Sequence, residues 1–156
     1  LHLSIRRQRQ MCIRDSYLAM VRRMHHITQP IVEDNGGELV KYEADNLYAF
    51  FPSVAAATVA AAAIHAAAAA EDVPDGQSRI RVSIGIAWGK LLSVPGADFF
   101  GDCVNVAAKL GEDIAGPAET LLSAEARDQL PADTGFAFEE LNLSVSGLAL
   151  RAWKLR

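Results

Sequence analysis

A chain of 156 residues suffices for one domain with a hydrophobic core and is too short for two ordinary domains. Apolar residues make up 51% of the chain, which excludes a disordered protein. The net charge of −4 excludes a global basic field for nucleic acid, and no segment has the ~20 strongly apolar residues of a membrane span. The two cysteines are far apart in sequence, which excludes a disulfide framework and favours a reducing, cytoplasmic location.

Residues 1–16 (LHLSIRRQRQMCIRDS) show neither a helical nor a strand period. Their back-translation resembles the adapter used in transposase-based sequencing libraries. We therefore expect residues 1–16 to be a non-native, adapter-derived segment and residues 17–156 to be the domain; the alternative is a genuine basic N-terminal arm. Residues 17–156 carry 11 basic and 18 acidic side chains, so the expected domain has a net charge of −7.

The first half of this domain predicts a helix, a hairpin and a second helix. Apolar residues recur at helical spacing in the first helix, where Pro30 predicts a kink. Asp45-Asn46 is the expected tight turn of the hairpin, and Ser53 is the expected N-cap of an alanine-rich helix. The predicted elements are a helix over 17–33, strands over 38–44 and 47–51, and a helix that ends at residue 70.

The second half predicts strands alternating with two helices. Alternating apolar residues predict a buried strand over residues 79–88, with residues 89–94 as its hairpin partner. The remaining predicted elements are helix 101–110, strand 119–122, helix 123–130 and strands 136–141 and 149–155. This order indicates an α+β fold, a ferredoxin-like βαββαβ unit whose first strand is missing, followed by a C-terminal α/β extension. We expect an antiparallel sheet with helices on one face.

Three stretches then carry a resemblance to a known family. They are GGELVKYEADNLYAFFPS (36–53), RIRVSIGIAWGKLL (79–92) and DFFGDCVNVAAKLGEDIAGP (98–117). In order and spacing they resemble the catalytic domain of class III adenylate/guanylate cyclases. The resemblance implies a ferredoxin-like cyclase domain in which the ribose 3′-hydroxyl of a nucleotide attacks its own α-phosphate and pyrophosphate leaves.

The resemblance also implies roles for five residues. Asp45 matches the family's second metal aspartate in a site for two Mg or Mn ions; the alternative is that it only serves the turn. Glycines usually flank this aspartate in the family, and Ala44 and Asn46 do so here. Lys41 and Asp98 match the base-reading pair. We expect Lys41 and Asp45, four residues apart, to share one strand face. A lysine donor and a carboxylate acceptor complement the N1 and N6 edge of adenine, which favours ATP over GTP.

Asn105 matches the family's ribose-orienting asparagine, and Lys109 stands where the family has a transition-state arginine. The exchange keeps the charge but loses the planar bidentate fork of arginine. The late turn at Ser146-Gly147 lacks the family's triphosphate-binding lysine. The first metal aspartate would fall at or before Leu1, so we expect residues 1–156 to be inactive and to leave two strand edges unpaired.

The family shares each site between two chains, so the resemblance implies a homodimer. Asp45 of one subunit would face the base-reading pair, the asparagine and the transition-state cation of the other. For the parent protein the first hypothesis is an adenylate cyclase that makes cyclic AMP for intracellular signalling. The second is a degenerate dimerisation or nucleotide-binding module without turnover. A third, a ferredoxin-like RNA-binding domain, conflicts with the acidic charge, so we expect neither a nucleic-acid partner nor membrane contact.

Overall fold

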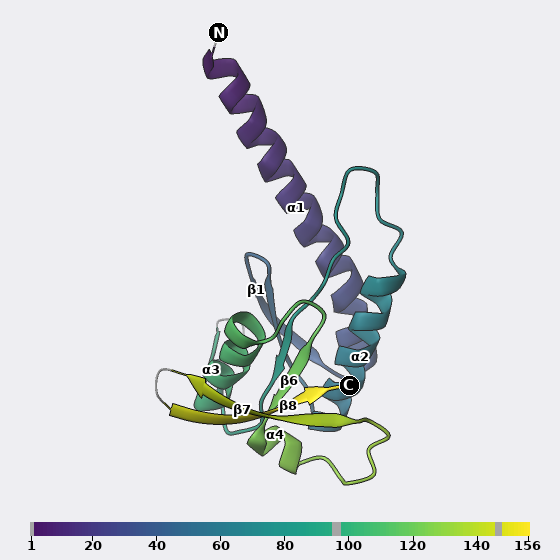
Figure 1. Ribbon diagram of the computed structural model, residues 1–156, viewed down its shortest axis with the longest axis vertical. Coiled ribbons are helices and arrows are strands. Elements are labelled where there is room, and N and C mark those ends of the chain that lie inside the picture. The colour runs from purple at the N-terminus through teal and green to yellow at the C-terminus, as the bar shows by residue number, and fades with distance from the viewer. Residues whose placement is uncertain (1, 95–97, 146–147) are drawn as a thin grey trace.

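The computed structural model describes the backbone of residues 2–94, 98–145 and 148–156, and the side chains of residues 14–92, 99–144 and 149–156. Helices and strands mix along the chain, which confirms the α+β class (Figure 1). None of the helices in the described ranges is long and apolar enough to cross a membrane. The elements are α1 (His2–Asp34), β1 (Glu38–Glu43), β2 (Asn46–Phe50), α2 (Val54–Ala70), β3 (Ile84–Ile86), β4 (Leu92–Val94), β5 (Asp98–Phe100), α3 (Asp102–Ala108), the π-helix η1 (Lys109–Ile114), β6 (Thr120–Ser123), α4 (Ala124–Asp128), β7 (Phe138–Val145) and β8 (Leu148–Leu155).

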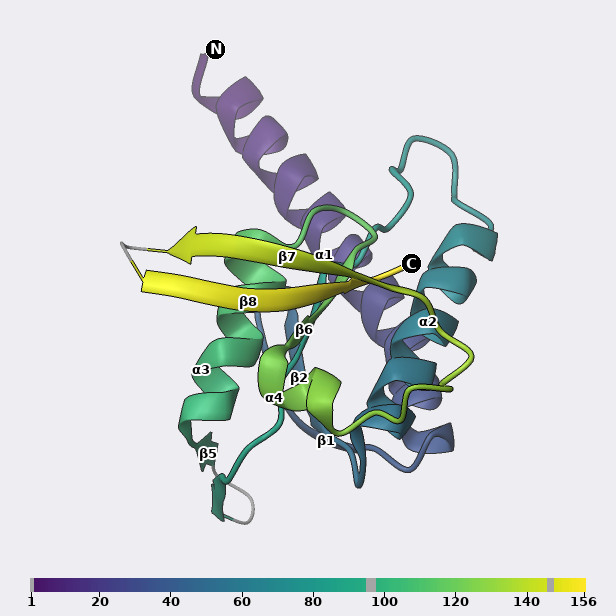
Figure 2. The ribbon, with the colours of Figure 1, turned by 60° about the horizontal axis from the view of Figure 1, so that its bottom comes forward.

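Helix α1 is longer than the sequence predicted. It begins at His2 rather than near residue 17, and it continues through Pro30 to Asp34. Residues 1–16 contain no glycine or proline and include four Arg, two Gln, two Leu and one Met, so intrinsic helix propensity favours a helix even without an amphipathic period. The N-terminal half of α1 projects away from the rest of the fold (Figures 1 and 2).

The β1–β2 hairpin forms as predicted, but its turn lies one residue earlier. Glu43 pairs with Asn46, so the turn residues are Ala44 and Asp45 rather than Asp45 and Asn46. Ala44 has φ 55°, in the left-handed region that favours glycine. Asp45 therefore stands at the tip of the hairpin, beyond the strand alternation.

Helix α2 starts where the sequence predicted. The Ser53 hydroxyl accepts a hydrogen bond from the Ala56 amide at 3.1 Å, the usual N-cap contact. The far end of α2 is tied to α1 by Arg23, which donates to both carboxylate oxygens of Glu71 at 2.6 Å.

The strands form three separate sheets. One is the two-stranded β1–β2 sheet, one has the order β3-β6-β8-β7, and one is the β4–β5 hairpin. The β3–β6 pair is parallel, which the expectation of an antiparallel sheet did not include, and the β6–β8 and β7–β8 pairs are antiparallel. β2 and β3 are therefore both edge strands in the described sheets.

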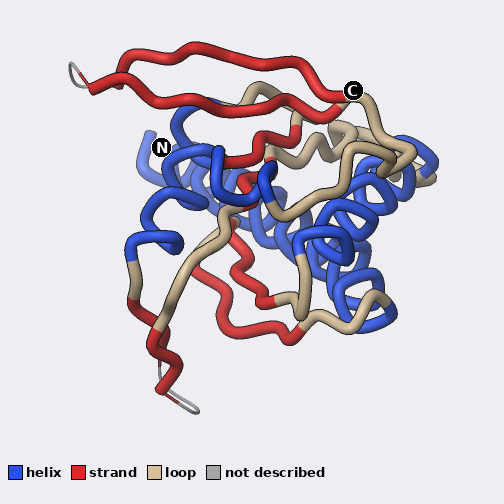
Figure 3. Tube along the Cα trace, turned by 90° about the horizontal axis from the view of Figure 1, so that it is seen from below, coloured by secondary structure: helices blue, strands red, loops and turns tan. Residues whose placement is uncertain are grey.

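The partner predicted for the strand over 79–88 is wrong. Leu92–Val94 pairs with Asp98–Phe100 to form the β4–β5 hairpin, and β3 pairs with β6 instead. Period-2 alternation predicts a strand without identifying its neighbour. The β4 and β5 strands project from one end of the molecule, away from β7–β8 (Figure 3).

Two apolar clusters hold the elements together. The first joins α2, β3, β6 and α4 through residues such as Ala61, Ile86 and Leu122. The second lies between η1, β6 and β8, where Leu110, Leu121 and Ala152 are almost completely buried. The second cluster fixes the start of η1, which follows α3 directly.

Candidate active site

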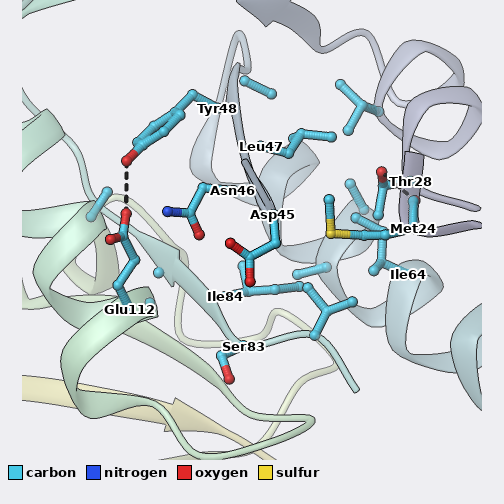
Figure 4. Close-up of a pocket in the computed structure, with 18 of the residues that line it drawn as sticks. Met24, Thr28, Asp45, Asn46, Leu47, Tyr48, Ile64, Ser83, Ile84 and Glu112 are labelled. Atoms are coloured by element: carbon cyan, nitrogen blue, oxygen red, sulfur yellow. Dashed lines mark hydrogen bonds between the residues drawn. The ribbon is translucent and has the colours of Figure 1, made fainter. Parts of the chain in front are cut away.

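Asp45 lines a large cavity between the hairpin and β3. The cavity has a volume of about 1220 Å³, and helices α1, α2 and α3 also contribute to its walls. Figure 4 shows the Asp45 carboxylate turned toward the cavity, with Ile84 of β3 nearby. Partial removal from water raises the pKa of Tyr17, and the charge of Asp45 and a hydrogen bond to it add to that rise.

The described residues do not complete a metal site around Asp45. Within the described ranges there is no group of three or more His, Cys, Asp or Glu side chains that could hold an ion. A single carboxylate with a tyrosine beside it is a poor donor set for Mg²⁺, which prefers several oxygen ligands in octahedral geometry. Residues 14–92 and 99–144 therefore supply at most part of such a site.

Lys41 lies on β1 among aromatic rings rather than in the cavity. Its Nζ is 3.0 Å from a Glu43 carboxylate oxygen and 5.4 Å from the ring centroids of both Tyr48 and Phe99. Lys41 and Glu43 share one face of β1, as strand alternation requires. The expectation that Lys41 and Asp45 share a strand face is not met, because β1 ends at Glu43 and Asp45 lies in the turn.

The β4–β5 hairpin carries position 98 to the neighbourhood of Lys41. Asp98 is the first residue of β5 and pairs with Val94; its side chain lies outside the described residues. The next residue, Phe99, is 6% exposed and packs against Phe50 at 5.1 Å and Tyr48 at 5.6 Å between ring centroids. These ring contacts anchor β5 on the β1–β2 sheet.

Asn105 and Lys109 lie one helical turn apart, as their spacing predicted. Asn105 is exposed on α3, and the Lys109 amide donates to its carbonyl oxygen at the end of that helix. The Lys109 ammonium is 2.5 Å from an Asp113 carboxylate oxygen one turn further on. Lys109 therefore already has an acidic partner within its own helix.

The helix over 101–110 does not stop at Leu110 but continues as the π-helix η1. The Ala115 amide donates to the Leu110 carbonyl at 2.8 Å, an i→i+5 bond. This segment passes very close to β3: a Cβ placed on Gly85 would lie 2.0 Å from the Ala107 carbonyl oxygen and 2.6 Å from the Gly111 amide. Two glycines thus allow the helix that carries Asn105 and Lys109 to contact β3 backbone to backbone.

Sequence reasoning missed a polar link between β2 and η1. The Tyr48 hydroxyl donates to a Glu112 carboxylate oxygen at 2.7 Å. This hydrogen bond is the main cause that raises the pKa of Tyr48 to about 12, with burial and the charges of Glu112 and Glu43 adding to it and Lys41 opposing it. No sequence signal indicated the link, because the partners are 64 positions apart.

The structure does not bring the five predicted residues together in one chain. Asp45 lines the cavity, whereas Lys41, Asn105 and Lys109 are not among the described residues that do so. Lys41 lies beside β5, the strand that begins at Asp98. The Ser146-Gly147 turn lies outside the described residues.

Comparison with solved structures places this arrangement in a family. No family model matches the chain, and no curated protein matches it. An adenylate/guanylate cyclase/hydrolase from Silicibacter pomeroyi is 31% identical, with 82% of this chain and 77% of that chain covered at a TM-score of 0.70. The chain belongs to the class III adenylate/guanylate cyclase family.

Other cyclase domains share the fold at lower identity. Adenylate cyclases from Trypanosoma brucei, analysed in their monomeric state, match with a TM-score of 0.79 at 16% identity, covering 93% of this chain and 80% of theirs. The catalytic core of a rhodopsin-guanylyl cyclase with converted specificity, in complex with ATPalphaS, matches with a TM-score of 0.78 at 18% identity, covering 91% and 83%. Because these relatives include both adenylate and guanylate cyclases, membership of the family does not decide whether the substrate base is adenine or guanine.

Proposed function

We propose that this cyclase domain belongs to an adenylate cyclase, which converts ATP to cyclic AMP and pyrophosphate. The observation that carries the proposal is the position of Lys41 beside Phe99, the residue that follows Asp98 on β5. Lys41 on β1 as a donor and Asp98 at the start of β5 as a carboxylate acceptor would complement the N1 acceptor and N6 amine of adenine. Guanine presents a donor at N1 and an acceptor at O6, and it would want the opposite pair.

In the proposed site Asn105 orients the ribose and Lys109 stabilises the negative charge that develops on the α-phosphate. Lys109 would have to leave or share Asp113, because an ammonium 2.5 Å from a carboxylate is partly neutralised. Asp45 would contribute one oxygen ligand to a Mg or Mn ion, with further ligands from outside the described residues. That the first metal aspartate is absent from residues 1–156 stays a prediction.

We further propose a homodimer with two shared sites. In one chain Asp45 lines the cavity, whereas Lys41, Asn105 and Lys109 are not among the described residues that line it. A two-fold axis would bring Asp45 of each subunit toward these three residues of the other. We also propose that the domain comprises residues 17–156 and that residues 1–16 are non-native.

The second candidate is a degenerate cyclase module that binds nucleotide or dimerises without turnover. The Lys109–Asp113 ion pair favours it, because it engages the one cation that stands in the place of the family's arginine.

Nucleotide binding separates the base-reading proposal from turnover. We expect ATP to bind more tightly than GTP in calorimetry with Mn²⁺ present, and Lys41→Met to remove at least the ~1 kcal/mol of a single hydrogen bond from that preference. Lys90→Met, an exposed lysine outside the proposed site, is the matched control. Equal binding of ATP and GTP by the unaltered chain would refute adenine recognition by Lys41 and Asp98.

Turnover is measured separately, as cyclic AMP formed from ATP by the full-length parent protein and by the same variants of it. Asp113→Ala frees the Lys109 ammonium, and Lys109→Arg restores a bidentate fork. A rise in product with either variant supports a cyclase limited by that cation. Bound ATP without product in all variants favours the degenerate module.

A further inference from the structure

Tyr48 lies directly opposite the proposed base-reading lysine in the β1–β2 hairpin. The strand register shifts between Leu39 and Lys41, and beyond this irregularity Lys41 and Tyr48 are partners across the two strands. Side chains at opposed positions of an antiparallel pair contact each other, and a shift in register changes which residues are opposed. The Lys41 ammonium accordingly lies 5.4 Å from the centre of the Tyr48 ring. Tyr48 is therefore one of the side chains that hold this ammonium in place.

The hydroxyl end of Tyr48 is bound to η1. It donates to a Glu112 carboxylate oxygen at 2.7 Å (Figure 4). Hydrogen bonds to a charged acceptor are stronger than those between neutral groups. This bond is the main reason why the pKa of Tyr48 rises to about 12, so the hydroxyl keeps its proton and remains a donor at neutral pH. One side chain thus connects the ammonium of Lys41 to η1.

Glu112 follows two residues whose positions are fixed by packing. Leu110 is almost completely buried in the second apolar cluster. Gly111 touches the neighbouring strand, since a Cβ placed on it would lie 2.8 Å from a backbone nitrogen of β3. The hydrogen bond from Tyr48 therefore ties the hairpin to a well-packed part of the fold. That part is the element that begins with Lys109.

We propose that the Tyr48–Glu112 hydrogen bond positions the base-reading lysine. It holds Lys41 at a set distance from Asn105 and Lys109. This inference rests on the proposed function, in which Lys41 contacts the base while the other two contact the ribose and the α-phosphate of the same nucleotide. The ribose links base and α-phosphate through few bonds, so the groups that bind the two ends must keep a matching spacing. A bond between their two elements supplies that spacing before the nucleotide arrives.

Nucleotide binding to the full chain tests the proposal, by calorimetry with ATP and with GTP in the presence of Mn²⁺. Tyr48→Phe removes the hydroxyl and keeps the ring beside Lys41. We expect it to weaken ATP binding about three- to tenfold, the effect of one hydrogen bond. Glu112→Ala should weaken binding by the same factor, and the double variant by no more than either single change, because both substitutions break one bond. Glu112 is exposed, so its variant keeps the test decisive if Tyr48→Phe fails to fold.

Two controls separate a positioning role from general support of the fold. Glu112→Gln keeps an acceptor oxygen and should retain most of the affinity that Glu112→Ala loses. Tyr42→Phe makes the same substitution on the neighbouring strand, where the hydroxyl donates to Gln29 at 3.4 Å, and it should leave ATP binding unchanged. Equal losses in Tyr42→Phe and Tyr48→Phe would overturn the proposal.

A double-mutant cycle shows whether Tyr48 acts through Lys41. In the Lys41→Met background, Tyr48→Phe should change the affinity for ATP by less than about twofold, because the side chain that it positions is already gone. A purely structural effect of Tyr48 would persist in that background at full size. That result would overturn the proposal.

Failure of this inference and failure of the proposed function give different results. Equal affinities for ATP and GTP, with Tyr48 and Lys41 still coupled, would refute adenine recognition and support the positioning contact. A preference for ATP with an affinity that Tyr48→Phe does not lower would overturn the positioning contact and support adenine recognition. Binding of neither nucleotide to the unaltered chain would overturn both.

Discussion

A substitution at Gly85 tests how closely α3 and η1, which carry Asn105 and Lys109, pack against β3. In Gly85→Ala the new Cβ would lie 2.0 Å from the Ala107 carbonyl oxygen, so helix and strand must separate by more than about 1 Å to regain ordinary contact. Both sides of the clash are backbone, and overpacking of this kind costs typically 1–3 kcal/mol, so we expect about 3 kcal/mol here. For a domain of this size that lowers Tm by about 6–12 °C.

Thermal unfolding followed by circular dichroism measures this loss. Gly76→Ala is the control: Gly76 has φ +78° with no atom near its Cβ position, so alanine there incurs only the left-handed backbone cost of about 1–2 kcal/mol. Gly85→Ala should therefore lower Tm clearly more than Gly76→Ala. If Gly85→Ala lowered Tm by no more than Gly76→Ala does, the close packing of α3 and η1 on β3 would be refuted.

Two further predictions concern titrating side chains. Burial lowers the pKa of His65, whose Nε2 is 2.8 Å from the Thr120 hydroxyl. The free energy of unfolding should therefore fall as pH decreases below about 6.5, because the unfolded chain binds the proton more readily than the folded one. In urea unfolding between pH 7.5 and 5.5, His65→Gln should remove that pH dependence. An unchanged slope in the variant would contradict this. Because Glu112 raises the pKa of Tyr48 to about 12, Glu112→Gln should lower that pKa toward the ordinary value near 10. The ionisation is measured as tyrosinate absorbance, with Tyr48→Phe as the blank. An unchanged pKa would contradict the hydrogen bond.

The sequence determined most local structure and the family. Residue patterns located the hairpin, α2, β6, α4 and the two late strands β7 and β8, and Ser53 and Ser123 cap the helices that they precede. Three motif stretches indicated a class III cyclase domain, and the 31% identical structure confirmed it. Such features depend on residues close together in the chain, where spacing and capping chemistry act directly.

Tertiary structure decided which distant segments meet. The sequence assigned residues 89–94 to the wrong partner strand, since alternation fixes the face of a strand and not its neighbour. It also missed the Gly85–Gly111 contact and the Tyr48–Glu112 hydrogen bond, because the residue types alone do not show which backbones approach within van der Waals contact. The sequence predicted two unpaired strand edges, but only the tertiary structure shows that β2 and β3 carry open edges and that both strands line one cavity.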